Sequence, residues 1–309
     1  MLANTILIIG TGLIGGSFAK GLKQRNLIRC AIGYGRRYEQ LELGIELAVI
    51  DEAARDLPQA IARADVIVLG VPTLTVADYL DVIAEHRKAD SVVTDVASVK
   101  GEIAHVIREH YGVIPPWFVL GHPIAGSEKS GITASNSDLY VHHKVILTPE
   151  VDTDENALAL IRALWEGVGA DVVCMGIDEH DRVLAATSHL PHALAFSLVD
   201  CLQAMDANVD VFRFAAGGFR DFTRIAGSHP VMWHDIMLAN KSAILEMMGE
   251  FKATLSNLEN AIENDDSDTI LAMFERAKAS REHFAGLIDA ASSTESNAAK
   301  SADLSKDKN

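Results

Sequence analysis

An apolar run, a glycine cluster and a helix-length segment follow one another at the N-terminus. The run Ile6–Ile9 leads directly into the glycine cluster 10–16. Gly10 permits a tight turn, Gly12 lets a pyrophosphate approach the backbone, and Gly15 lets a helix pack closely on the strand. This succession predicts a dinucleotide site at a helix N-terminus, and an ordinary glycine-rich turn is the alternative.

The segment from residue 4 to about residue 175 alternates short β-branched runs with helix-length stretches, which predicts βαβ units and a mostly parallel sheet. Several runs are continuously apolar, as expected of strands that helices cover on both faces. We therefore predict an α/β protein with a Rossmann-type domain at residues 1–178. The runs are Ile6–Ile9, Cys30–Gly33, Val66–Val71, Ser91–Val96, Phe118–Leu120, Lys144–Leu147 and Asp171–Cys174.

Helical periodicity replaces the strand pattern after residue 178. Segments 179–207, 230–263 and 266–290 carry apolar residues at three- and four-residue spacing. They predict an all-helical domain at 179–291 that forms a bundle or a subunit interface. Residues 292–309 have almost no large apolar side chain, which predicts a disordered tail.

The net charge and the cysteines restrict the partners. A net charge of −16, from 43 acidic and 27 basic residues, repels nucleic acid and anionic lipid. Cys30, Cys174 and Cys201 lack the spacing of a disulfide framework or a zinc site, and no signal peptide or membrane-length run is present. We expect a cytoplasmic protein with no metal, nucleic-acid or membrane partner. An anionic substrate would need local cationic residues.

The end of the second predicted strand bears on cofactor choice. A preference for NAD usually requires an acidic residue there, but the sequence after Gly33 continues as Tyr34-Gly35-Arg36-Arg37. Arg36 or Arg37 could pair with a 2′-phosphate, so NADP is favoured. NAD is the alternative if both arginines only begin a solvated helix.

Ligands of such sheets bind beyond the carboxyl ends of the strands, so the residues that follow each strand are candidates. His122 follows one strand and is flanked by Gly121 and Pro123, which predicts a loop that aims the imidazole. Its near-neutral pKa suits a base that accepts a hydroxyl proton while hydride leaves the same carbon. A surface-loop histidine is the alternative. Other residues in such positions are Val71, Pro72, Thr73, Ser98, Lys100 and Thr148.

Two segments of the second half have an unusual composition. Ser188–His192 interrupts a helical pattern, and Gly217–Arg224 is basic and begins with two glycines. Arg220 and Arg224 share one helical face, and either could clamp a carboxylate. The alternative for at least one of them is an ion pair with Asp221 or another acid.

Five motifs in order carry a family resemblance that runs over roughly residues 4–290. They are GTGLIGGS at 10–17, DVASVKG at 95–101, GHPIAGSEKSG at 121–131, SHLPHALAF at 188–196, and GGFRDFTRIA at 217–226 followed by Trp233. With these motifs the chain resembles the prephenate and arogenate dehydrogenases of tyrosine biosynthesis, also called cyclohexadienyl dehydrogenases.

The resemblance implies an NAD(P)-dependent oxidative decarboxylation of prephenate or arogenate, small anionic cyclohexadienyl compounds, to 4-hydroxyphenylpyruvate or tyrosine. By motif position, His122 resembles the catalytic histidine, Ser98 the serine that orients it, and Arg224 the arginine that binds the substrate carboxylate. The resemblance also implies a homodimer formed through the helical domain. The remaining residues that it places at the substrate are His192, Ser127, Trp233 and Glu128, the last as a gate or ion-pair partner. The residues expected at the cofactor are Gly10, Gly12, Leu13, Ile14, Gly15, Arg36, Arg37, Val71 and Pro72.

Two other functions remain as alternatives. Dehydrogenases of the β-hydroxyacid or imine reductase type share the expected domains but do not predict GHPIAG together with SHLPH. A binding protein that senses dinucleotides could keep the fold without catalysis. The presence of His122, Ser98 and Arg224 argues for an enzyme.

Overall fold

The computed structural model describes residues 1–127, 129–205 and 211–306. The chain divides into two compact units, residues 1–247 and residues 248–309. Within the described ranges, every helix is too short or too polar to cross a bilayer.

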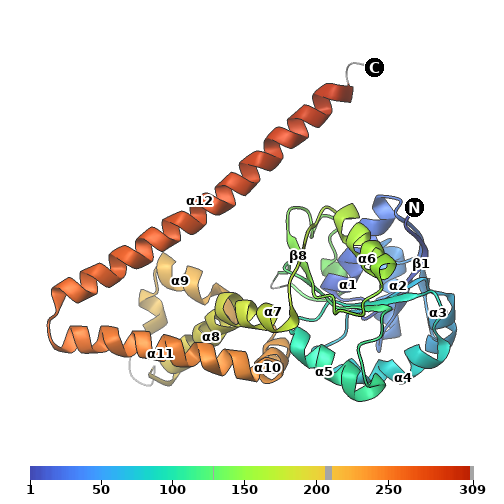
Figure 1. Ribbon diagram of the computed structural model, residues 1–309. Coiled ribbons are helices and arrows are strands. Elements are labelled where there is room, and N and C mark those ends of the chain that lie inside the picture. Colours follow the sequence, from blue (N-terminus) through green and yellow to red (C-terminus); the bar gives the residue numbers. More distant parts are fainter. Residues whose placement is uncertain (128, 206–210, 307–309) are drawn as a thin grey trace. The chain divides into compact units, whose positions relative to one another are not determined.

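A six-stranded parallel sheet with the order β3-β2-β1-β4-β5-β6 forms the centre of the first unit (Figure 1). The predicted Rossmann-type, mostly parallel sheet is therefore confirmed. The strand order reverses between β1 and β4, and in such sheets ligands bind at the carboxyl ends of the strands near this reversal. The strands are β1 (Ala3–Ile9), β2 (Ile28–Tyr34), β3 (Glu52–Ala53), β4 (Val66–Leu69), β5 (Val92–Asp95) and β6 (Phe118–Val119).

Helices cover both faces of this sheet because its strands are apolar on both sides. Ile6 and Ile8 of β1 pack in one core, where Phe18 stacks on Trp165 with ring centroids 3.8 Å apart. Leu7 lies in the second core, on the opposite face. The helices of the first face are α1 (Leu13–Gln24), α2 (Tyr38–Glu46) and α6 (Glu155–Gly167), and those of the second are α3 (Leu57–Arg63), α4 (Ala77–His86) and α5 (Lys100–Tyr111).

A second sheet has the order β7-β8-β9, with β7 antiparallel to β8 and β8 parallel to β9. Its strands are β7 (Gly121–Pro123), β8 (Lys144–Leu147) and β9 (Asp171–Cys174). His122 pairs with Ile146, so it lies in a strand and the predicted loop is wrong. β7 tolerates Pro123 because it is an edge strand of three residues.

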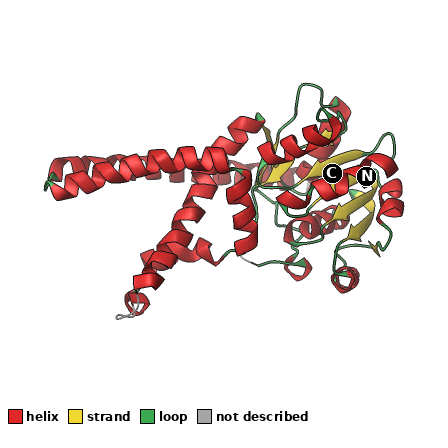
Figure 2. Ribbon diagram, turned by 90° about the horizontal axis from the view of Figure 1, so that it is seen from below, coloured by secondary structure: helices red, strands yellow, loops and turns green. Residues whose placement is uncertain are grey.

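The rest of the first unit is helical (Figure 2). The predicted segment 179–207 is observed up to residue 205 as two helices joined by the π-helical turn Ala185–His189, and residues 206 and 207 lie outside the described residues. The backbone thus stays helical where the sequence pattern is interrupted. The predicted segment 230–263 is divided at Asn240, which caps a helix. The helices are α7 (Ile177–Leu184), α8 (Leu190–Met205), α9 (Gly217–Thr223), α10 (Pro230–Ala239) and the start of α11 (Lys241–Glu263).

The second unit contains the remainder of α11 and the helix α12 (Ser267–Lys306). The backbone is helical to Lys306, which differs from the disorder predicted for 292–309. Residues 292–306 contain neither glycine nor proline, so local propensity permits a helix there. Disorder of this segment in solution stays a prediction for hydrogen exchange, as does the domain boundary at residue 178.

Candidate active site

The turn between β1 and α1 has the geometry of a dinucleotide-binding loop. Gly10 has a φ of +96°, and a Cβ there would lie 2.4 Å from the oxygen of Gly70, so a side chain is excluded. A Cβ on Gly15 would lie 2.7 Å from Cγ2 of Ile8, which shows how closely α1 packs on β1. Gly12 caps α1, and a Cβ there would meet no atom within 4 Å. The backbone N–H groups of this helix start can therefore be approached by a pyrophosphate.

The other predicted cofactor residues lie around the same sheet edge. Leu13 and Ile14 form the first turn of α1, Val71 and Pro72 follow β4, and Arg36 and Arg37 follow β2. Both arginines are exposed, and neither forms an ion pair with a residue that the structure describes. Their neighbours are engaged, because Arg55 stacks over Tyr38 and Arg63 pairs with Glu52.

A buried ion pair fixes the strand that carries His122. Lys100 and Asp95 are fully buried and paired. Lys100 Nζ donates to the carbonyl oxygen of Gly121 at 2.6 Å, and the backbone N–H of Gly121 donates to Asp95 Oδ1 at 3.2 Å. The end of β5 and the start of α5 thus hold Gly121, the residue that precedes His122, through both its backbone N–H and its carbonyl oxygen.

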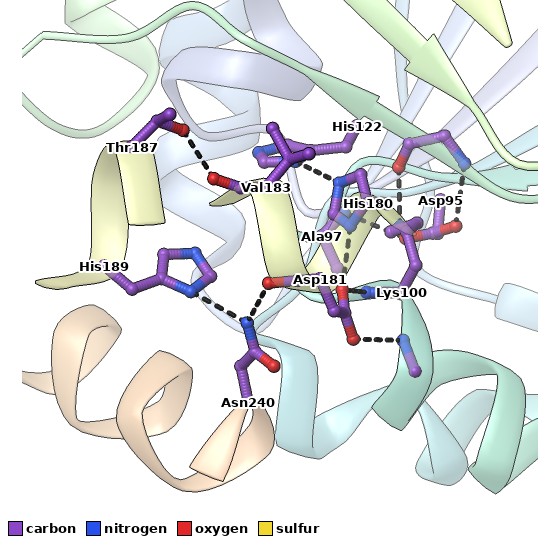
Figure 3. Close-up of polar contacts among 12 residues, drawn as sticks. Asp95, Ala97, Lys100, His122, His180, Asp181, Val183, Thr187, His189 and Asn240 are labelled. Atoms are coloured by element: carbon purple, nitrogen blue, oxygen red, sulfur yellow. Dashed lines mark hydrogen bonds and ion pairs between the residues drawn. The ribbon is translucent and has the colours of Figure 1, made fainter. Parts of the chain in front are cut away.

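His122 is 8% exposed, and its ring joins a hydrogen-bonded chain with two residues of α7 (Figure 3). His122 Nδ1 lies 2.8 Å from His180 Nε2, and His180 Nδ1 lies 2.7 Å from Asp181 Oδ1. Asp181 also accepts hydrogen bonds from the backbone N–H groups of Lys100 and Gly101, at 2.9 and 2.8 Å. These two N–H groups belong to the first turn of α5.

The charges around this chain of rings favour a neutral His122. Burial, together with His180 and the Lys100 ammonium, holds the pKa of His122 well below its usual value. Burial opposes ionisation of Asp181, yet the hydrogen bonds from His180 and from the backbone keep the pKa of its carboxyl lowered. His122 is therefore available as a base, beside an ionised carboxylate.

Sequence reasoning missed His180, Asp181 and Asn240. Asn240 Nδ2 donates to the carbonyl oxygen of Asp181 at 2.9 Å and lies 3.0 Å from His189 Nδ1. Burial lowers the pKa of His189 to about 4, so this ring is neutral and can accept. The only sequence signal for the pair is the dipeptide His-Asp, which occurs again at 234–235, where the histidine side chain is 64% exposed.

Two predicted substrate residues lie together in the helical part of the first unit. His192 of α8 stacks on Trp233 of α10, with ring centroids 3.6 Å apart and an interplanar angle of 19°. His192 Nδ1 lies 2.9 Å from the backbone oxygen of Ser188. Trp233 is 7% exposed, and its Nε1 has no hydrogen-bond partner among the described residues. A buried indole N–H without a partner is uncommon and is free to donate to a ligand.

The two candidate arginines differ in their partners. Arg220 forms an exposed ion pair with Asp221 at 3.7 Å, as the alternative interpretation expected for one of them. Arg224 is exposed and forms no ion pair within the described part of the chain. Its charge contributes to the lowered pKa of His192, after burial, so the guanidinium lies near that ring.

The remaining predicted residues are less well defined. Ser98 is half-buried in the loop after β5, but His122 Nδ1 is bonded to His180, and no hydrogen bond joins Ser98 to the His122 ring in the structure. Ser127 is exposed, and its hydroxyl accepts from the backbone of Lys129. Glu128 lies outside the described residues. Among the described residues, no group of three or more His, Cys, Asp or Glu could hold a metal ion.

Comparison with known protein families shows to which family the chain belongs. The nucleotide-binding domain family of prephenate dehydrogenase matches residues 18–174, and the prephenate dehydrogenase dimerization domain family matches residues 177–276. The chain belongs to the prephenate dehydrogenase family. The resemblance drawn from the sequence motifs is therefore confirmed, and the chain is a dehydrogenase by family.

Named relatives agree along nearly the whole chain. The cyclohexadienyl dehydrogenase of Zymomonas mobilis is 34% identical over 279 residues, which cover 89% of this chain and 94% of that protein. The prephenate dehydrogenase of Bacillus subtilis is 36% identical over 279 residues, which cover 89% of this chain and 74% of that protein. The crystal structure of prephenate dehydrogenase from Aquifex aeolicus, in complex with hydroxyphenyl propionate and NAD⁺, is 36% identical with a TM-score of 0.85, covering 91% of this chain and 98% of that chain.

Proposed function

We propose that this enzyme oxidatively decarboxylates prephenate, arogenate or both, with a nicotinamide dinucleotide as hydride acceptor. The products are 4-hydroxyphenylpyruvate from prephenate and tyrosine from arogenate, each with carbon dioxide. The observation that carries the proposal is His122, a buried neutral imidazole held through Nδ1. Its strand β7 is bonded to Asp95 at the end of β5, in the six-stranded sheet whose β1 leads into the glycine loop.

The reaction needs a base at the ring hydroxyl. The bound nicotinamide supplies the hydride acceptor. As hydride leaves the carbon that bears the hydroxyl, His122 Nε2 accepts the hydroxyl proton and so assists formation of the carbonyl. The ring carboxylate then leaves as carbon dioxide, the electron pair of the broken C–C bond completes the aromatic ring, and the former carbonyl oxygen takes a proton to give the phenol.

The remaining residues have proposed roles in binding. Arg224 binds a substrate carboxylate, because its guanidinium is exposed and lies near His192. Trp233 offers a buried N–H donor beside the His192 ring. Ser98 follows β5 and orients His122 beside the nicotinamide, and Ser127 and Glu128 line the substrate site. These roles are supported by motif position and, for Arg224 and Trp233, by the contacts above.

We further propose NADP as the preferred cofactor. Arg36 and Arg37 are exposed at the carboxyl end of β2 and form no ion pair with a described residue, so both can bind a 2′-phosphate. NAD is the competing choice, since the crystal structure of the Aquifex relative contains NAD⁺. A higher kcat/KM with NADP supports the proposal, and equal or better efficiency with NAD contradicts it.

We also propose a homodimer formed through the helical residues 177–276, the range matched by the dimerization domain family. Sedimentation equilibrium should give about twice the chain mass of 33.3 kDa. We place the enzyme in a reducing cytoplasm, because Cys30, Cys174 and Cys201 are free thiols.

Steady-state kinetics with both substrates crossed against both cofactors tests the proposed reaction. Turnover of prephenate or arogenate, with release of carbon dioxide equal to the NAD(P)H formed, is the expected result. Dinucleotide binding without turnover of either substrate would instead favour the dinucleotide-sensing alternative.

A further inference from the structure

We propose that His180 and Asp181 are positioning residues that hold His122 in one tautomer, with its proton on Nδ1 and its lone pair on Nε2. Only one part of this inference rests on the proposed function, namely that Nε2 accepts the hydroxyl proton of the substrate. The tautomer itself follows from the hydrogen bonds of the folded chain.

The tautomer of His122 follows from the hydrogen bonds that connect it, through His180, to the Asp181 carboxylate. An ionised carboxylate only accepts, so His180 must donate to Asp181 Oδ1 through its Nδ1–H. A neutral imidazole has one N–H, which leaves His180 Nε2 as an acceptor. His122 must then donate through Nδ1, 2.8 Å away, and its Nε2 carries the free lone pair.

The titratable groups around His122 keep both histidine rings neutral, which this assignment of donors and acceptors requires. His180 of α7, Lys100 of α5 and His189 of the π-helical turn all disfavour a positive charge on His122. Burial is the largest cause of the lowered pKa of His180, and the Lys100 ammonium adds to it, although Asp181 and Asp95 act in the opposite direction. Both rings are therefore neutral before reaction. When His122 Nε2 takes a proton, the nearby Asp181 carboxylate stabilises the new charge through His180.

Asp181 itself is fixed by elements that are distant in the sequence. The first turn of α5 supplies two N–H donors, and the amide of Asn240, between α10 and α11, holds its backbone oxygen. A Cβ on Gly101 would lie 2.6 Å from Asp181 Oδ2. The glycine that ends DVASVKG thus leaves room for the carboxylate, a role that the motif alone does not indicate.

Two other histidine–carboxylate pairs show what distinguishes this one. His234 lies 3.0 Å from Asp235, and His110 lies 3.2 Å from Asp81. In each pair one side chain is more than half exposed, at 64% for His234 and 93% for Asp81. Water competes for their hydrogen bonds, so neither pair fixes a tautomer as the buried pair does.

The tautomer can be observed without turnover. Long-range ¹H–¹⁵N correlation spectra of the full-length enzyme, labelled with ¹⁵N-histidine, separate the two neutral tautomers, and the signal lost in His122→Asn assigns His122. We expect a protonated Nδ1 and an unprotonated Nε2. A proton on Nε2 of His122 in the wild-type enzyme would overturn the proposal, whether or not the enzyme turns over prephenate or arogenate.

The functional part is tested with His180→Gln, His180→Leu and the distant control His110→Leu. Glutamine can accept from His122 and donate to Asp181, whereas leucine can do neither. We expect kcat of His180→Leu to fall roughly 10²-fold with little change in KM or dinucleotide affinity. His180→Gln should stay within about fivefold of the wild type, and the control should be unaffected.

Two results would overturn the positioning role. One is a folded His180→Leu enzyme with wild-type kcat. The other is an equal loss in the glutamine and leucine variants, which would show that the ring only fills space. Because the wild-type spectrum does not require His180→Leu to fold, the tautomer remains testable if that variant is unstable. A wild-type enzyme with the expected tautomer but no turnover of either substrate would reject the proposed reaction and leave the tautomer assignment intact.

Discussion

The two sides of the candidate site differ in how the fold supports them. On one side His122, His180 and Lys100 are buried, and each forms a hydrogen bond to another part of the core. On the other side the segment 217–227, which carries Arg224, has no buried residue. The difference indicates that the core of the chain holds the proposed proton acceptor in place, whereas it leaves the proposed substrate-binding arginine without a fixed partner among the described residues. Variants on the buried side should therefore lower kcat, whereas variants of Arg224 should raise KM.

The largest effect is expected on the buried side, from His122→Asn. Asparagine can still form a hydrogen bond but cannot accept the proton, so kcat should fall roughly 10²–10⁴-fold while substrate and cofactor still bind. Stopped-flow and steady-state assays at neutral pH, with thermal unfolding as the fold control, measure this. A folded variant with near-normal kcat would remove His122 from the mechanism and direct attention to Ser98 and His192.

On the exposed side, Arg224→Ala should impair substrate binding. Loss of a charge-assisted carboxylate contact costs about 2–4 kcal/mol, which corresponds to a KM higher by roughly 30- to 900-fold. The dissociation constant for the dinucleotide should be nearly unchanged, and so should Tm, because Arg224 is exposed. Arg220→Ala, which removes a side chain paired with Asp221, is the matched control. A normal KM for Arg224→Ala would move the carboxylate contact to Arg220 or Lys100.

Gly101→Ala tests whether the position of the Asp181 carboxylate on the buried side affects kcat. The added Cβ would lie 2.6 Å from Asp181 Oδ2, so the carboxylate must move and His180 loses its fixed acceptor. We expect kcat to fall about tenfold, together with a lower Tm. Gly286→Ala is the control, since it is also helical but a Cβ there meets no atom within 4 Å. Unchanged kcat with a lower Tm would limit the role of Gly101 to stability.

The smallest effect concerns the cofactor end, where the arginines are exposed. Arg36→Ala should reduce the ratio of kcat/KM for NADP to that for NAD by about fivefold, because an exposed contact with the 2′-phosphate contributes on the order of 1 kcal/mol. Arg37→Ala shows which arginine dominates. A ratio unchanged in both variants would identify the pair as a solvated helix start.

The features that could be predicted from the sequence are local. Continuous apolar runs and the spacing of Gly10, Gly12 and Gly15 determine strands and a turn over a few residues, and the structure has both. His122 was predicted in a loop because its strand exists only through pairing with β8, over twenty residues later in the chain. His180 and Asp181 were missed because nothing near 180–181 distinguishes them from the pair at 234–235, whose histidine is exposed. Burial by distant elements gives the first pair its role, and a single sequence does not report it.

The pH dependence of kcat for the wild type and His122→Asn tests the central claim most directly. The base must be neutral to act, and the pKa of His122 lies well below its usual value. The account therefore predicts that wild-type kcat stays level through pH 6.5, the ordinary pKa of a histidine, and declines only at lower pH. His122→Asn should show a low kcat without that acid limb. An acid limb that persists unchanged in a folded His122→Asn enzyme would contradict the assignment of His122 as the base.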